Sequence, residues 1–139
     1  MNWSRFALAT LAVFVVSTLL NFVIHGVLLK PAYMNSEDLM RAPADASSHA
    51  VYLLVGFLFF SIGFVWIYTA GVNPTHWVSQ GVHYGILVWL IASVSRYFIY
   101  YAIQPWPFQT VLEQIGLELI LSLILGVLVA AIYRVKAPA

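Results

Sequence analysis

The sequence of 139 residues contains no cysteine and little charge, with only six Lys or Arg and five Asp or Glu. The missing cysteine excludes disulfides, thiolate metal sites and cysteine nucleophiles. Charged residues make up 8% of the chain, against about 25% in soluble domains, which excludes a nucleic-acid-binding protein with a basic face. No HExxH, Walker or GxSxG motif is present. We therefore expect neither enzymatic activity nor a metal site.

The sequence is rich in hydrophobic residues, which make up 63% of it. A soluble domain of this size could not bury so much in its core. Four apolar segments, residues 6–29, 49–71, 78–103 and 108–133, each reach the roughly 20 residues that a membrane-spanning helix needs. The sequence therefore predicts an all-α, integral membrane four-helix bundle, one transmembrane domain over residues 1–139. The first segment is longer than a signal-peptide core, so we expect it to be retained.

The connections are short except for the first loop, residues 30–48, which holds five of the eleven charged residues. There Ser36 precedes Glu37 and Asp38, a pattern typical of a helix start, so a short interfacial helix is predicted over residues 36–41. Basic residues indicate the orientation. The side of the two termini carries Arg5, Arg134 and Lys136, and the other side carries Lys30 and Arg41. By the positive-inside rule this excess of three to two favours cytoplasmic termini, and a protein that inserts in both orientations would have a similar distribution.

Small residues recur at helical spacing and indicate faces where helices approach closely. The pairs are Gly56 and Gly63, Gly81 and Gly85, and Ser122 and Gly126. On the third segment, Ala92 and Arg96 are expected to continue the face of Gly81 and Gly85.

Two buried charges are expected to meet across the last hairpin. Arg96 and Glu118 each lie about ten residues, or about 15 Å of helix, from the turn at residues 105–107. An unpaired charge at the centre of a membrane helix costs about 2.5–3.5 kcal/mol, so an Arg96–Glu118 ion pair is predicted. Asn21 and His25 lie on the polar face of the first helix in the same leaflet, and Gln114 shares the face of Glu118. We interpret these five residues as one polar cluster, which either forms a small binding pocket or proton-accessible site, or fixes helix register without a ligand.

The histidines raise the question of a cofactor. A haem held between helices needs two histidines at matched depth, and only His25 with His49 meets that condition; His25 or His83 could also ligate a magnesium pigment. Histidines bonded to backbone or water at the interface are the simpler interpretation, so no cofactor is expected.

Several short elements are familiar. They are the run from Asn21 to Leu29 followed by Tyr33, Gln80-Gly81 with Tyr84-Gly85, Gln104-Pro105 with Pro107, and the helix end from Gly126 to Arg134. Together they resemble a loose group of small, uncharacterised bacterial four-helix membrane proteins. The resemblance implies a bacterial four-span protein of the inner (cytoplasmic) membrane, in which His25 recurs near the loop, and it implies no activity.

Three functions are compatible with these features. The first is a non-catalytic accessory or structural subunit of a larger membrane complex, whose partners are other membrane subunits and the lipid bilayer. The second is a small transporter or channel that pairs with a second copy of itself and has a polar intramembrane site. The third is a haem- or quinone-associated redox subunit that uses His25 and Arg96 with Tyr97 or Tyr100. We favour the accessory subunit because no complete catalytic constellation is present.

Overall fold

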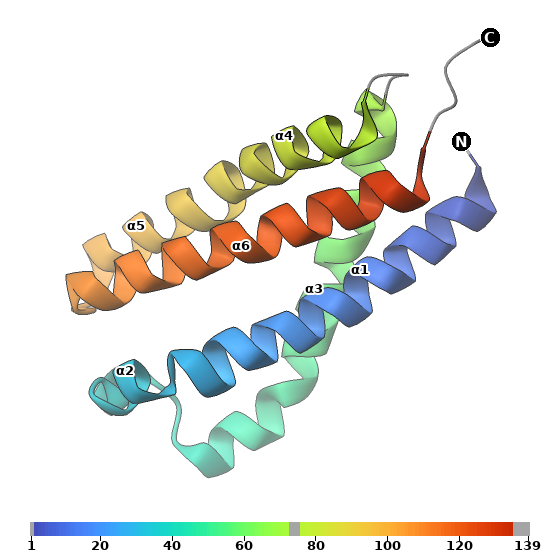
Figure 1. Ribbon diagram of the computed structural model, residues 1–139. Helices are drawn as coiled ribbons and strands as arrows, with labels where there is room; N and C mark the ends of the chain where they lie inside the picture. The colour runs from blue at the N-terminus through green and yellow to red at the C-terminus, as the bar shows by residue number, and fades with distance from the viewer. Residues whose placement is uncertain (1, 73–75, 135–139) are drawn as a thin grey trace, which may run out of the picture.

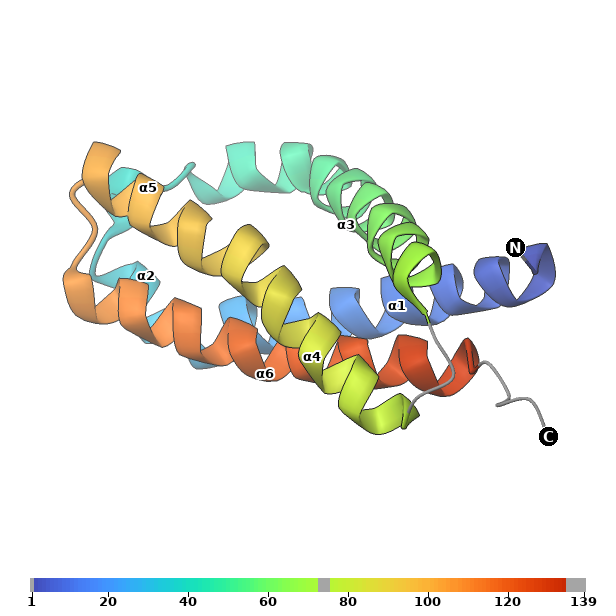
Figure 2. The same cartoon turned by 90° about the horizontal axis from the view of Figure 1, so that it is seen from above.

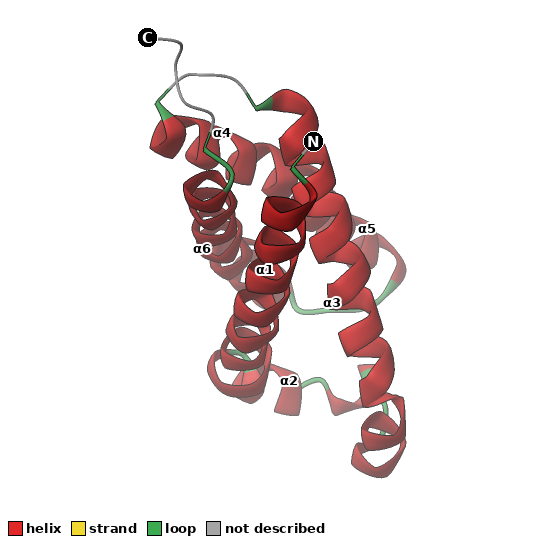
Figure 3. Ribbon diagram, turned by 90° about the vertical axis from the view of Figure 1, so that its right-hand side faces the viewer, coloured by secondary structure: helices red, strands yellow, loops and turns green. Residues whose placement is uncertain are grey.

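The computed structural model describes residues 2–72 and 76–134, which contain helices and no strand (Figure 3). The helices are α1 (Trp3–Val23), α2 (Lys30–Met34), α3 (Pro43–Gly71), α4 (Trp77–Trp89), α5 (Ser95–Ile103) and α6 (Phe108–Ile132). Five-residue π-helical turns extend α1 (Ile24–Leu28) and join α4 to α5 (Leu90–Val94). Four segments are long and apolar enough to cross a membrane: Trp3–Leu28, Pro43–Gly71, Trp77–Ile103 and Phe108–Ile132. The predicted all-α fold is confirmed, and the four segments indicate a multi-pass membrane protein.

The first loop differs from expectation. Instead of a helix over residues 36–41 there is one 3-10 turn, Glu37–Leu39, which follows the unpredicted α2. α3 begins at Pro43 rather than near residue 49, because proline suits the first helical position and Asp45 in the first turn favours the helix dipole. Residues 73–75 of the second connection and Lys136, which entered the orientation argument, lie outside the described residues.

The two ends of the described chain meet. The backbone N–H of Asn2 donates to the Tyr133 hydroxyl at 2.9 Å, and the Arg5 guanidinium donates to the Arg134 carbonyl at 3.0 Å. The start of α1 and the end of α6 therefore share one end of the bundle, called here the termini end (Figure 1). The first loop and the α5–α6 connection lie at the opposite loop end.

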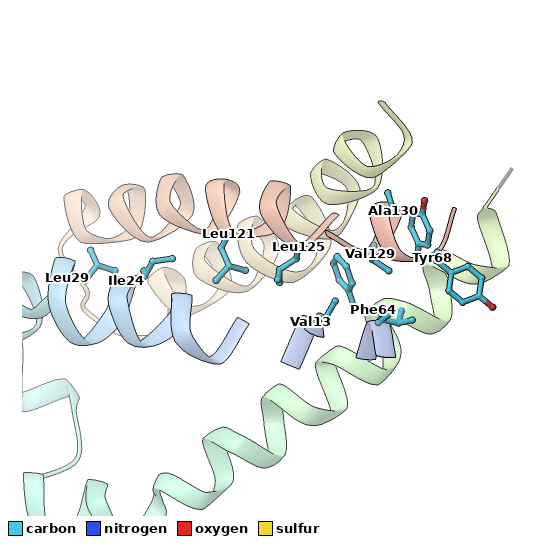
Figure 4. Packing of buried hydrophobic residues seen from close by; sticks show 12 residues of the cluster. Val13, Ile24, Leu29, Phe64, Tyr68, Leu121, Leu125, Val129 and Ala130 are labelled. Atoms are coloured by element: carbon cyan, nitrogen blue, oxygen red, sulfur yellow. The ribbon is translucent and has the colours of Figure 1, made fainter. Parts of the chain in front are cut away.

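The core forms where α1, α3 and α6 meet (Figure 4). Val13 of α1, Val65 of α3 and Leu125 and Val129 of α6 are fully buried there. The remaining buried apolar side chains of this cluster extend along α6 toward both ends of the bundle. α6 is thus the central helix, and it contacts both α1 and α4.

Small residues bring α4 and α6 into backbone contact. A Cβ atom added at Gly81 would lie 2.6 Å from the Gly126 carbonyl oxygen, and one added at Gly85 would lie 2.5 Å from the Ser122 carbonyl oxygen. The predicted small faces of these two helices therefore meet each other. Gly56 and Gly63 of α3, which were also predicted to be packing positions, have no neighbouring atom within 4 Å of an added Cβ. Among the described residues the predicted packing is not seen, because both glycines line open cavities, Gly63 one between α3 and α4 and Gly56 a smaller one nearer the first loop.

The tilt of α3 opens the bundle on one side (Figures 2 and 3). Phe64, Val65 and Tyr68 in its second half are buried, whereas residues 50–56 are exposed. Near the termini end α3 is tied to α4, because the Tyr84 hydroxyl donates to the Phe64 carbonyl and the Tyr68 hydroxyl donates to the Gln80 side chain at 3.3 Å. The same two helices line a cavity of about 870 Å³, which runs from Phe59 and Ala92 near the middle of the spans to Gly71 and Ser79 at the termini end and which we call the α3–α4 groove.

Candidate functional site

Glu118 of α6 is the centre of the polar cluster. Its side chain is only 7% exposed, and its Oε1 atom faces three groups from two other spans. His25 Nε2 lies at 3.2 Å, the Tyr97 hydroxyl at 3.4 Å and an Arg96 guanidinium nitrogen at 3.8 Å. A buried carboxylate needs such partners, because without them its desolvation would be uncompensated.

Arg96 is therefore a looser partner of Glu118 than the sequence suggested, and His25 is the nearer one. The cause is the π turn over Leu90–Val94, which inserts an extra residue into the third span. The buried positions of this span are consequently Gly81, Gly85, Ser93 and Tyr97 rather than Ala92 and Arg96. Arg96 is displaced to the side of the helix and remains 47% exposed.

Hydrogen bonds extend from Glu118 to the first loop through His25. The Gln114 amide N–H donates to the Tyr33 hydroxyl oxygen at 3.1 Å, and that hydroxyl lies 2.6 Å from His25 Nδ1. Since the Tyr33 oxygen accepts from Gln114, its proton is free to be donated to Nδ1. Neutral His25 then carries its proton on Nε2 and donates it to Glu118, so one tautomer gives each hydrogen bond of the series a donor and an acceptor.

Local geometry at the loop end places Tyr33 in this series. The π turn over Ile24–Leu28 is followed directly by α2, which carries Tyr33 back over the ring of His25. The two rings are stacked, with centroids 6.0 Å apart, and Trp106 packs edge-on against Tyr33 at 5.9 Å. Tyr33 and Tyr97 were not among the predicted cluster residues. Only their closeness in sequence to His25 and Arg96 could have indicated them.

Asn21 lies beside the cluster without joining its hydrogen bonds. Its amide donates to the Ser17 carbonyl at 2.9 Å, within its own helix. Ser17 and Thr18 also bond back to the carbonyl of Phe14, as hydroxyl side chains commonly do in helices. Of the polar face predicted for the first helix, His25 alone is seen to reach another span.

Two small cavities flank the contact between His25 and Glu118. The loop-end cavity, of about 290 Å³, is lined by His25, Tyr33 and Gln114 together with Tyr97, Tyr100 and Trp106. The inner cavity, of about 270 Å³, is lined by Asn21, Arg96 and Glu118 and by the α3 residues Tyr52 and Gly56. The five predicted cluster residues thus surround one level of the bundle but open onto two separate spaces.

Burial raises the pKa of Tyr33, and the nearby Glu118 carboxylate adds to this effect against the Gln114 hydrogen bond. Tyr33 therefore stays a neutral donor. We expect Tyr33→Phe to lower the free energy of unfolding by about 1–2 kcal/mol, because His25 Nδ1 and the Gln114 amide lose their partner. The raised pKa means that the contribution of Tyr33 is present below about pH 10 and lost as the pH rises through the raised value.

This expectation is checked by denaturant unfolding in detergent at pH 7 and at a series of higher pH values. Tyr100→Phe is the matched control, because Tyr100 lines the same cavity and its side chain is partly exposed. Equal losses in the two variants would contradict a specific role for the Tyr33 hydroxyl.

The three histidines considered as cofactor ligands, His25, His49 and His83, have other contacts or are exposed. Both ring nitrogens of His25 are hydrogen-bonded. The Nδ1 atom of His49 lies 3.1 Å from a carboxylate oxygen of Asp45 in the same helix. His83 is exposed on the α3–α4 groove. Among the described residues, no three His, Cys, Asp or Glu side chains are grouped as metal ligands. An iron ligand at His25 would have to displace Tyr33 or Glu118.

Comparison of the chain with protein-family models, with curated proteins and with solved structures gave no match.

Proposed function

We propose that the protein is a non-catalytic accessory protein of the membrane, which acts by holding another membrane component in the α3–α4 groove. The observation that carries this proposal is the groove itself, a cavity of about 870 Å³ between two membrane-spanning helices that the chain does not fill. Its lining is mainly apolar and aromatic, with Phe60, Phe64 and Leu87 as examples. Gly63, which lines it, has open space at its Cβ position and so admits close approach by another molecule.

The polar cluster supports a structural role beside this groove. Gln114, Tyr33, His25 and Glu118 use their donors and acceptors on one another. Such a closed series joins α1, α2 and α6 and fixes their register, and it leaves no activated nucleophile or free base.

The test is gentle detergent extraction of the tagged protein from its native membrane, with native mass and absorption spectrum recorded together. We expect the wild-type protein to carry additional mass and Gly63→Leu to lose it, because a leucine side chain would occupy the groove. Gly116→Leu is the control, since Gly116 on α6 also has open space at its Cβ position but does not line the groove. Identical masses for all three proteins would overturn the proposal, and pigment or haem bands would favour a redox subunit.

The second candidate is a small homodimeric transporter with a polar intramembrane site. The two cavities on either side of the His25–Glu118 contact favour it, because a substrate or proton path needs access from both sides. Flux through reconstituted vesicles should then be lost in a folded Glu118→Gln variant. The redox candidate is less well supported, because His25 and Arg96 line different cavities.

A further inference from the structure

The α3–α4 groove and the inner cavity adjoin and form one space, which we call the spanning cleft. Phe60 of α3 and Ala92 of the third span line both parts, so the two meet near the middle of the spans. From there the groove reaches Gly71 at the termini end, and the inner cavity reaches Tyr52 toward the loop end. From Tyr52 to Gly71 α3 rises about 29 Å, and a bilayer's hydrocarbon core is about 30 Å thick. The spanning cleft therefore has the length of a whole transmembrane helix.

One face of α3 lines the spanning cleft from end to end. Its residues follow one another at three- or four-residue spacing, as positions on a single helix face do. They are Tyr52, Gly56, Phe60, Gly63, Ile67 and Gly71. The third span contributes a second face, made of Gln80, Tyr84, Val88, Ala92 and Arg96. Two helix faces that line one space along its whole length leave a site shaped for a third helix.

The spanning cleft has exposed rims and a buried floor. Phe59 of α3 and Ile91 of the third span are exposed on the rims. Phe64 and Tyr68 are buried at the bottom of the groove, and Leu121 of α6 is buried at the bottom of the inner cavity. A partner could therefore enter sideways from the lipid without any separation of the core.

Two glycines of α3 allow a helix to pack closely in the spanning cleft. Gly63 lines the groove and Gly56 lines the inner cavity, and a Cβ added at either meets no atom of the described residues within 4 Å. The two glycines are seven residues apart, which is about two helical turns. Small residues on one face let helix backbones approach each other, and this packing drives association between helices in lipid.

Arg96 adds a positive charge in the loop-end half of the spanning cleft. Its nearest guanidinium nitrogen is 3.8 Å from Glu118 Oε1, which is longer than a hydrogen bond. A guanidinium has five N–H donors, and with the side chain 47% exposed some of them remain for a further acceptor. Charged groups at membrane depth pair with one another, and a carboxylate is the acceptor that matches guanidinium best.

We propose that the spanning cleft binds one transmembrane helix of another membrane protein, and that this helix carries an aspartate or glutamate at the level of Arg96. The backbone of the partner helix would lie against Gly56 and Gly63, and its carboxylate would accept from the Arg96 guanidinium. This inference rests on the proposed function, because it names the membrane component that the groove holds.

A second copy of the chain fits the spanning cleft less well. The acidic residues of the described spans are Asp45, Glu113 and Glu118. Each already contacts a side chain of its own chain, namely Arg41, Gln109 and His25 respectively. The carboxylate for Arg96 is therefore expected from a different protein.

The experiment is photo-crosslinking in the native membrane, with the adducts identified by mass spectrometry. Tyr52 on the inner cavity or Ile67 on the groove is replaced by benzoylphenylalanine, and Ile120, which is exposed on α6 outside both parts, is the control position. We expect the first two positions to label one and the same partner helix at sites about 15 residues apart, as the probes are along α3. An aspartate or glutamate should lie within about two turns of the Tyr52 adduct. The control position should not label this helix.

Substitutions in the crosslinking proteins test the two parts separately. Arg96→Gln should lower the yield of the partner adduct about tenfold, because a charge-assisted hydrogen bond is lost, and Arg96→Lys should retain part of it. Gly63→Leu should also lower the yield, because leucine would occupy the space of the partner's backbone. Arg41→Gln and Gly116→Leu, which change a loop charge and a glycine outside the spanning cleft, should behave as wild type.

Different results would separate the inference from the proposed function. Adducts of lipid alone at both probe positions would overturn the partner helix and leave the groove as a binding site. Adducts with a second copy of the chain would overturn the inference in favour of a homodimer. A partner helix labelled equally well in Arg96→Gln would overturn the acidic contact. Labelling from Ile67 that does not exceed labelling from Ile120 would contradict occupancy of the groove and, with it, the proposed function.

Discussion

Replacement of Gly126 by valine should be the most damaging single change in the bundle, lowering the free energy of unfolding by about 3 kcal/mol or preventing folding. A Cβ atom at this position would run into the Gly81 carbonyl oxygen and would lie 3.0 Å from the Gly85 nitrogen. These neighbours are backbone atoms of α4, so no side-chain rotation can make room. The two helices would have to separate along their shared face, and apolar contacts on both sides of Gly126 would be lost with it.

SDS titration in detergent micelles, followed by circular dichroism, would measure this effect. The matched control is Gly116→Val on the same helix, where an added Cβ meets no atom within 4 Å. It introduces the same side chain and the same change in helix propensity, so it should cost far less. Similar losses in the two variants would contradict a direct backbone contact between α4 and α6 at Gly126.

Removal of the Glu118 carboxylate should have the second large effect. Glu118→Leu leaves His25 and Tyr97 without an acceptor and Arg96 without a counter-charge, and breaking a buried charged network in this way typically costs about 3–5 kcal/mol. Glu118→Gln should cost less, because the amide oxygen can still accept from His25 Nε2 and Tyr97. Arg96→Gln should cost less than Glu118→Leu, because Glu118 keeps its nearer contacts with His25 and Tyr97 and its contact with Arg96 is loose.

Double-mutant cycles would compare the two contacts of Glu118, with His25 and with Arg96, directly. The coupling energy between His25 and Glu118 should exceed that between Arg96 and Glu118, since the first pair is 3.2 Å apart and the second 3.8 Å. The opposite order would restore the ion pair expected from the sequence as the principal contact of Glu118.

Much of the fold could be predicted because the bilayer imposes it. A chain with four apolar segments of more than 20 residues has few alternatives to four helices, since each segment must satisfy its own backbone hydrogen bonds. The contact between Gly81, Gly85 and Gly126 was also foreseeable, because small residues at four-residue spacing are typical of close helix packing. The tilt of α3 was not foreseeable, since Gly56 and Gly63, seven residues apart on one helix face, also suggested close packing, yet a Cβ added at either meets no atom of the described residues within 4 Å.

The predicted ion pair between Arg96 and Glu118 is present, but the nearer contact of Glu118 with His25 was not predicted. Depth along each helix could be counted from the turns, so Arg96, Glu118 and His25 were correctly placed at one level. The π turns over Ile24–Leu28 and Leu90–Val94 decide which side chains face one another. A prediction that assumes a constant 100° per residue does not include the extra residue of a π turn. The π turn over Leu90–Val94 accounts for the burial of Tyr97 rather than Arg96. The π turn over Ile24–Leu28 is followed directly by α2, which brings Tyr33 to His25.

The hydrogen bonds from Asn2 to Tyr133 and from Arg5 to Arg134 have a practical consequence for topology mapping. Because these two ends of the chain touch, reporter domains fused to either end must emerge in the same compartment. A short linker could also join them, and the chain could then be reopened between α2 and α3 to give a circular permutant. Such a permutant would keep every membrane-spanning helix intact while moving both new ends to the opposite face of the membrane.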